Sequence, residues 1–318
     1  MPATTNFVAA QEANRRSTFI LLAVLTLLAA GFGYLIGWVL RSEATDSVPL
    51  VSGAGLVLAS GLAVVSVVWS LISLAFGSRF VVAMADAKEI AKEDAPQLFN
   101  VVEEMSIASG VPMPSVRVME TDALNAFATG TSASNATIAV TRGLLNALNR
   151  NELQGVIAHE MSHIANLDTR YMTIVGVTVG LIALIADMIL RTLQWGGTSS
   201  SRSSSDKKSS GAGLLIIVLV VVAIIAPIAA KAVQMAVSRQ REYLADATSV
   251  QFTRNPDGLI SALQKLAAAA APFPGVSRAT QHLFIVNPIK TFTAKSSALL
   301  ATHPDVADRI ARLRNLGA

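Results

Sequence analysis

Two long uncharged stretches constrain this chain more than any other feature of its sequence. No charged residue occurs in residues 18–40 or in residues 48–78. Each stretch is long enough to cross a bilayer core of about 30 Å as a helix, and the first exceeds the usual apolar region of a signal peptide, about 7 to 15 residues. We therefore expect a transmembrane hairpin over residues 18–78, and favour it over a cleaved signal peptide.

The composition agrees with a membrane protein. Hydrophobic residues make up 52% of the 318-residue chain and charged residues only 14%, with a mean hydropathy of +0.53. Cysteine is absent, which excludes thiol proteases and cysteine-zinc modules and leaves His, Asp and Glu as metal ligands. The net charge of +4 comes mostly from basic residues beside apolar stretches. Membrane topology explains these residues, so we expect a lipid bilayer as partner and no nucleic acid.

The basic residues also predict the orientation of the hairpin. Arg15 and Arg16 precede the first apolar stretch and Arg79 follows the second, whereas the intervening loop 41–47 carries one basic and two acidic residues. Cytoplasmic flanks of membrane helices are enriched in Lys and Arg. We therefore expect the amino terminus and everything after Arg79 to lie in the cytoplasm.

A His-Glu-x-x-His motif at residues 159–163 is the strongest chemical signal. Four residues apart on a helix, His159 and His163 lie on one face about 6 Å apart along the axis and can bind one metal ion. Zinc suits such a pair, because imidazole is a usual ligand and a catalytic zinc keeps a position open for water. Glu160 can reach that water as general base. The alternative is a surface helix whose histidines have this spacing by chance.

An open catalytic zinc site needs a third protein ligand, commonly a Glu from a later helix. Glu242 is the best candidate, because Asp246 follows one helical turn later and can accept the free ring N–H of a zinc-bound histidine. The alternative is a solvated helix face on which Arg239 and Arg241 pair with these two acids. Spacing alone does not decide between the two readings.

The remaining pattern predicts a small α+β domain that is mainly helical. We expect an amphipathic helix at 88–109, strands at 115–119, 125–130 and 136–141, and a helix with the metal motif from about residue 150. Two shorter apolar stretches, 172–190 and 214–230, lie near the lower limit for spanning a membrane, about 17 residues. They flank a Ser-rich linker at 198–213.

Three sequence elements, taken in order, resemble the HtpX family of bacterial and archaeal inner-membrane zinc metalloproteases, which are related to the CAAX prenyl proteases and the Oma-type protease. They are Asn125-Ala126-Phe127, the motif at 159–163 with Asn166 and Asp168, and residues 241–246. The resemblance implies a gluzincin site with one zinc per subunit: ligands His159, His163 and Glu242, Glu160 as base and proton donor, and Asp246 supporting a histidine. It also implies that an edge strand with Asn125, Ala126, Phe127 and Ala128 binds an extended substrate.

By the same resemblance, the protein would reside in the bacterial inner membrane as a multi-pass protein with its protease domain in the cytoplasm. Its substrates would be misfolded or damaged membrane proteins or unfolded polypeptides, cleaved in quality control and stress responses. The expected domains are a cytoplasmic segment (1–17), the hairpin (18–78), the first part of the protease domain (79–171), two apolar helices with the linker (172–230) and the second part of the protease domain (231–318).

Two other functions stay open: an intramembrane metalloprotease, and a non-catalytic membrane protein with a structural metal. Three further residues receive weaker predictions. His303 could donate a hydrogen bond to the oxyanion of the reacting carbonyl or cap the last helix ahead of Pro304. Arg309 is expected to pair with a carboxylate such as Asp305, one turn back, and His282 to be structural.

Overall fold

The computed structural model describes residues 7–42, 51–178, 239–269 and 304–316. These residues belong to two compact units. The hairpin unit contains residues 19–42, 51–73 and 178. The site unit contains residues 7–18, 74–177, 239–269 and 304–316. The first helix therefore contributes its opening turns to the site unit and the rest of its length to the hairpin.

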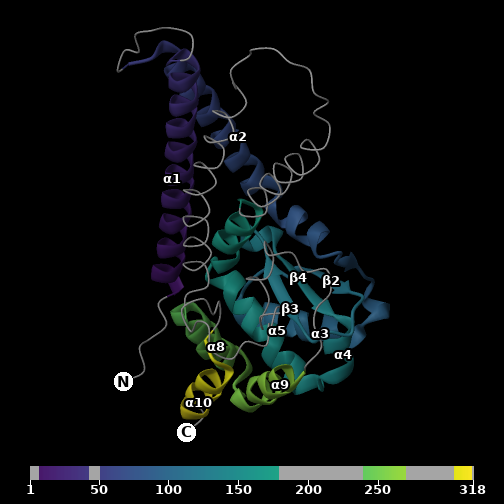
Figure 1. The fold of residues 1–318 in the computed structure, drawn as a ribbon. Helices are drawn as coiled ribbons and strands as arrows, with labels where there is room; N and C mark the ends of the chain where they lie inside the picture. Colours follow the sequence, from purple (N-terminus) through teal and green to yellow (C-terminus); the bar gives the residue numbers. More distant parts are fainter. Residues whose placement is uncertain (1–6, 43–50, 179–238, 270–303, 317–318) are drawn as a thin grey trace, which may run out of the picture. The chain divides into compact units, whose positions relative to one another are not determined.

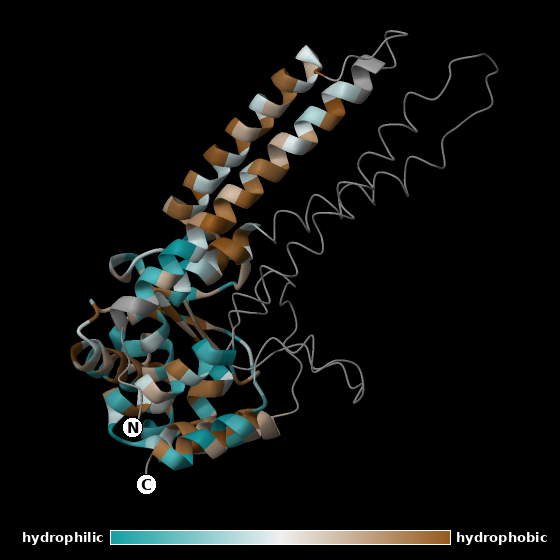
Figure 2. Ribbon diagram, turned by 90° about the vertical axis from the view of Figure 1, so that its left-hand side faces the viewer, coloured by the Kyte–Doolittle hydropathy of each residue, from teal (hydrophilic) through white to brown (hydrophobic). Residues whose placement is uncertain are grey.

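The hairpin unit is formed by two long helices, α1 (Phe7–Ser42) and α2 (Gly53–Met84). The first turns of α1 and the last turns of α2 belong to the site unit. Their stretches Gln11–Trp38 and Gly53–Met84 are long and apolar enough to cross a membrane, as predicted. Hydrophobic colour predominates along both helices (Figure 2). Leu27 and Val57 are 72% and 71% exposed, which suits contact with lipid rather than water.

Glycine lets the two helices of the hairpin approach closely. A Cβ atom at Gly33 would lie 2.4 Å from the carbonyl oxygen of Leu58, and one at Gly37 would lie 2.5 Å from that of Ala54. Small residues commonly form such contacts between membrane helices. The hairpin is thus a packed pair of helices.

A four-stranded sheet forms the centre of the site unit. Its strands are β1 (Lys88–Glu89), β2 (Ser115–Met119), β3 (Ala126–Thr129) and β4 (Thr137–Thr141), in the order β1-β2-β4-β3. β2 and β4 are parallel and the other pairs antiparallel. The three predicted strands are confirmed, and β1 was not predicted.

The expected helix at 88–109 is wrong in its first third. Residues Lys88–Glu89 pair with β2 instead, and a 3₁₀ turn (Lys92–Asp94) precedes α3 (Pro96–Ser109). Pro96 disfavours helical geometry at the residue before it, and Asp94 accepts the Ala91 N–H at 3.0 Å, which fixes the turn. The later part of the prediction holds, since Leu98, Val101, Val102 and Met105 are buried on α3.

One face of the sheet packs against helices α3 and α5 (Arg150–Ala165), as Figure 1 shows. Alternate strand residues supply that face: Val116 and Val118, Ala126 and Ala128, Ile138 and Val140. Apolar residues of α5 complete the core. The short α4 (Arg142–Ala147) leads into α5. Helices α8 (Arg239–Thr253) and α9 (Pro256–Ala268) pack against α5, and α10 (Val306–Leu316) packs against α8 and α9.

Helix α5 is fixed firmly at its start. Asn149 caps it by accepting the Glu152 N–H at 3.0 Å, and the Asn149 N–H donates to the Glu152 carboxylate at 2.8 Å. The same buried carboxylate accepts from Ser261 at 2.6 Å and from Lys265 at 2.7 Å, both on α9. These contacts hold the helix that carries the metal motif in a defined position.

Candidate active site

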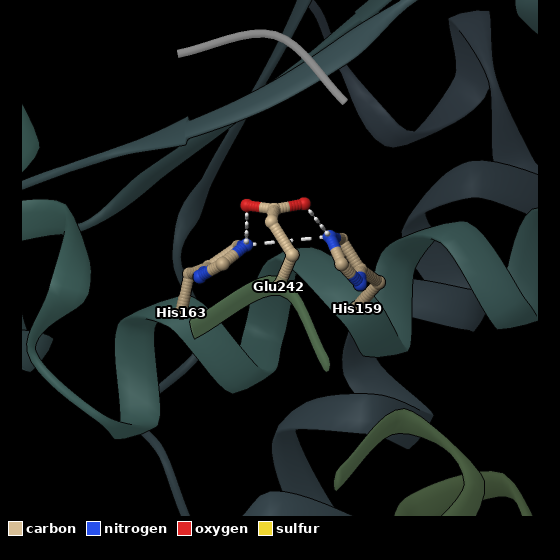
Figure 3. A group of neighbouring side chains, drawn as sticks. All are labelled: His159, His163 and Glu242. Atoms are coloured by element: carbon tan, nitrogen blue, oxygen red, sulfur yellow. Dashed lines mark hydrogen bonds and ion pairs between the residues drawn. The ribbon is translucent and has the colours of Figure 1, made fainter. Parts of the chain in front are cut away.

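Three side chains from two helices converge at one point in the site unit. His159 and His163 project from one face of α5, and Glu242 reaches them from α8 (Figure 3). The two Nε2 atoms are 3.3 Å apart, and each lies 3.7 Å from one oxygen of Glu242. All three residues are buried. The structure thus brings together the three predicted metal ligands.

The opposite ring nitrogens are held by carboxylates. His159 Nδ1 lies 3.0 Å from Asp246, and His163 Nδ1 lies 2.9 Å from Asp168. A proton on each Nδ1 leaves a lone pair on each Nε2. Two lone pairs and a carboxylate then face one another in a buried space, an arrangement that repels itself without a cation at its centre.

The donor set fits zinc in chemistry and in spacing. With Zn–N and Zn–O bonds of about 2.0–2.1 Å, the ligand atoms of a tetrahedral site are about 3.3–3.4 Å apart. The separations of 3.3, 3.7 and 3.7 Å are close to this. His159, His163 and Glu242 could therefore bind one zinc ion after shifts of a few tenths of an ångström, leaving a fourth position open.

Burial tunes the titration of the neighbouring acid. Glu160 is buried, and its burial raises the pKa to about 7, with the nearby Glu242 charge acting in the same direction. The backbone N–H of Ala128 on β3 donates a hydrogen bond to this carboxyl group. Glu160 can therefore both accept and release a proton near neutral pH.

The histidines respond differently to their partners. Burial works against the charged form of His163, yet its hydrogen bond to Asp168 and the Glu242 charge together raise the pKa to about 9. Burial and the positive charge of Arg309 lower the pKa of His159. A metal requires a neutral imidazole. This form is thus favoured at His159, whereas at His163 a metal would have to displace a proton.

Arg309 on α10 completes the site; it pairs with a carboxylate, as predicted, but the carboxylate is that of Asp246 and not that of Asp305. Its Nε and Nη2 atoms donate to the two oxygens of Asp246 at 2.9 and 2.6 Å, and Nη1 lies 3.6 Å from Glu242. Only its backbone N–H meets Asp305, whose carbonyl oxygen accepts it at 3.1 Å. Helix α10 turns Arg309 and Leu313, four residues apart, onto its buried face. This four-residue spacing could have indicated from the sequence that Arg309 shares the buried face with Leu313.

Glu242 and Asp246 do not form a solvated helix face. Each is only 2% exposed, which removes the alternative left open for this pair. The sequence did not single out Asp168 as the partner of His163, because the residue lies beyond the end of α5, where helical spacing predicts no contact. His303 and His282 lie outside the described residues.

Of the predicted substrate-binding residues, Ala126, Phe127 and Ala128 lie on β3, at an edge of the sheet, and Asn125 directly precedes the strand. Antiparallel pairing with β4 directs alternate N–H groups of β3 away from the sheet. Those of Ala126 and Gly130 donate to Asn125 Oδ1 at 3.1 Å and Thr173 Oγ1 at 3.2 Å, and that of Ala128 donates to Glu160. Substrate pairing along this edge stays a prediction. A substrate strand could pair here only by replacing the present acceptors of these N–H groups.

Comparisons with known proteins agree with this geometry. The profile of Peptidase family M48 matches residues 92–317. A protease HtpX homolog of Listeria monocytogenes is 43% identical over 309 residues, covering 96% of this chain and 98% of that protein. The homolog of Listeria innocua is 44% identical with the same coverage, and that of Streptococcus agalactiae is 43% identical over 306 residues, covering 95% and 97%.

Among solved structures, the crystal structure of S. mikatae Ste24p matches 79% of this chain and 57% of its own, with a TM-score of 0.44 and 18% identity. The similarity to the HtpX homologs extends over nearly the whole chain, and the family profile spans all the residues of the proposed metal site. The chain therefore belongs to peptidase family M48 and, within it, to the HtpX proteases, and it is a membrane metalloprotease.

Proposed function

We propose that this protein is a zinc-dependent endopeptidase whose active site opens to the cytoplasm. The observation that carries the proposal is the buried Glu160, with a pKa of about 7, beside three donor atoms spaced for one metal ion. A lone structural metal site would not need such an acid next to it. A base in this position is what peptide hydrolysis requires.

His159, His163 and Glu242 would hold one zinc ion per chain. A zinc ion bound here would act as a Lewis acid toward the scissile carbonyl and a water molecule. Glu160 accepts the proton of the attacking water at a carboxyl oxygen and then donates it to the leaving amine. Asp246 and Asp168 keep both imidazoles in the tautomer whose Nε2 atom is free.

The proposed location is the bacterial inner membrane, with the site unit in the cytoplasm. Arg15, Arg16 and Arg79 at the open end of the hairpin support this orientation. Ligands on both sides of residues 179–238 meet at one point. His163 and Glu242 must therefore lie on the same side of the membrane.

The proposed substrates are damaged or misfolded membrane proteins and unfolded polypeptides, cleaved in quality control under stress. The membrane hairpin supports membrane proteins as substrates, because it confines the protease to the surface where they are found. The edge position of β3 supports binding of an extended chain.

An intramembrane protease is disfavoured by the residues around the motif. Arg150, Glu152 and Asp168 flank it, and each charge at the centre of a bilayer costs about 2.5 kcal/mol or more. A purely structural metal is disfavoured as well. Such sites usually have four protein ligands, whereas the described part of the chain groups three.

The test compares detergent-purified wild type with Glu160→Gln for zinc content and for cleavage of an unfolded protein such as casein. Gln keeps an oxygen that can accept the Ala128 N–H, so the variant should fold and bind zinc. We expect about one zinc in each protein and chelator-sensitive cleavage by the wild type alone. Equal cleavage by the two, or zinc binding with no cleavage of any substrate by the wild type, would refute the proposal.

A further inference from the structure

The first turns of α1 pack against the end of the helix that carries the metal motif. Gln11 Nε2 donates to the carbonyl oxygen of Ala165 at 2.7 Å, and Asn14 Nδ2 donates to that of Asn166 at 2.9 Å. The last carbonyls of a helix have no partner within it. The amino-terminal segment thus supplies donors that α5 lacks at its end, although the sequence predicted only a polar cytoplasmic tail.

Asn14 also makes a contact that Gln11 does not. Its Nδ2 atom donates to Oδ1 of Asp168 at 2.6 Å, and Oδ2 of the same carboxylate lies 2.9 Å from Nδ1 of His163. A continuous chain of hydrogen bonds therefore runs from α1 to a proposed metal ligand. Asn14 is 5% exposed and Asp168 is 1% exposed, so water is largely kept from this chain.

Within the described part of the chain, few side chains orient the Asp168 carboxylate. Besides Asn14 and His163, Nε of Arg241 lies 3.8 Å from Oδ1, beyond hydrogen-bonding distance. Without the Asn14 amide, Oδ1 would lose its short hydrogen bond and the carboxylate could rotate. Since Asp168 fixes the tautomer and ring angle of His163, the loss would reach the Nε2 atom that faces the metal position.

We propose that Asn14, at the entry to the first membrane helix, is a positioning residue for the metal ligand His163 and acts through Asp168. The inference rests on the proposed metal site. In this role, the start of the membrane-crossing helix contributes to the geometry of the metal site. Helix α1 runs unbroken from Phe7 to Ser42, so the residue that orients Asp168 and the membrane-crossing segment belong to one helix.

Metal binding by the full-length protein in detergent tests this role. Zinc affinity is measured by competition with a chromogenic chelator, and the visible spectrum of the Co²⁺-substituted protein reports ligand geometry. We expect Asn14→Ala to weaken zinc binding about tenfold and to alter the Co²⁺ bands, at the lower end of the ~10–100-fold effect of removing outer partners of a ligand. Asn14→Leu keeps nearly the original volume and should have the same effects on zinc affinity and on the Co²⁺ bands. It keeps the test decisive if the alanine variant does not fold.

Gln11→Ala is the matched control. It removes an amide from the same helix that also donates to the end of α5, but it does not touch Asp168. We expect it to lower thermal stability of the metal-free protein about as much as Asn14→Ala and to leave zinc affinity and the Co²⁺ spectrum unchanged. A general loss of packing would move both variants together.

A double variant tests the route through Asp168. Asn14→Ala should add no further loss of zinc affinity once Asp168→Ala is present. Wild-type affinity in both Asn14 variants, equal effects of Gln11→Ala and Asn14→Ala, or independent effects of the Asn14 and Asp168 changes would overturn the inference. None of these readouts needs proteolysis, so failure of the wild type to bind zinc or to cleave counts against the proposed function separately.

Discussion

Replacing Arg309 by methionine removes the only described cation that is hydrogen-bonded to Asp246. The guanidinium is 1% exposed and contacts both oxygens of Asp246, with Glu242 at 3.6 Å. Methionine retains much of the side-chain volume and takes away the charge. Among the described side chains, Asp246 would then keep only His159 as partner, and no described cation would balance its buried negative charge.

The expected cost is that of breaking a buried ion pair, about 3–5 kcal/mol. A unit of roughly 200 residues loses about 2–4 °C in melting temperature for each kcal/mol, so the shift should be about 6–20 °C. Burial favours the neutral acid at Asp246, but Arg309 keeps its pKa below the ordinary value. Asp246→Asn should therefore remove most of the effect of Arg309→Met in a double-mutant cycle.

The assay is thermal unfolding of the detergent-solubilised protein in the presence of a chelator, because bound metal would mask part of the loss. Arg312→Met on the same helix is the control. Arg312 is exposed and lies 3.8 Å over the ring of Tyr243, a contact worth about 0.5–1 kcal/mol at such a site. If Arg309→Met proves as mild as Arg312→Met, the reasoning about the buried pair is refuted.

Two further predictions concern α5. Burial acts to raise the pKa of Glu152, but its hydrogen bonds to Lys265 and Ser261 lower it below the ordinary value. Its stabilising contribution is thus present at neutral pH and lost as pH falls through the folded-state pKa, so the melting-temperature gap between wild type and Glu152→Gln should narrow below about pH 4; a constant gap would contradict this. Gly155→Ala would place a Cβ 2.6 Å from the backbone nitrogen of Leu259, and should destabilise by about 1–3 kcal/mol despite better helix propensity. Gly61→Ala, with no atom within 4 Å, should show no such loss, and equal melting temperatures for the two variants would count against the steric argument.

Local patterns predicted the parts of this protein that depend on local geometry. The apolar stretches gave the hairpin, and the four-residue spacings of a helix placed His159 beside His163 and Asp246 beside Glu242. Alternation of apolar and polar residues predicted β2 with the same bounds that the structure shows. The helix start at Pro96 was available from the sequence too, because a proline restricts the residue before it.

Contacts between distant segments could not be predicted in this way. Asn14 and Asp168 are separated by 154 positions, and neither belongs to a periodic pattern that points at the other. Asp305 lies one turn from Arg309, so local spacing favoured the wrong partner. Tertiary packing decided instead, since burying α10 against α9 turns Arg309 inward to Asp246.

Asn14 and Arg309, which lie far apart in the sequence, support different ligands. The two ligands therefore gain their support at different times during synthesis. A ribosome makes Asn14 early, long before the Asp168 that it contacts, and makes Arg309 150 positions after His159. A nascent chain can insert its hairpin and form α5 while the charge that balances Asp246 does not yet exist. The site therefore stays incomplete until α10 has been synthesised and Arg309 can donate to Asp246.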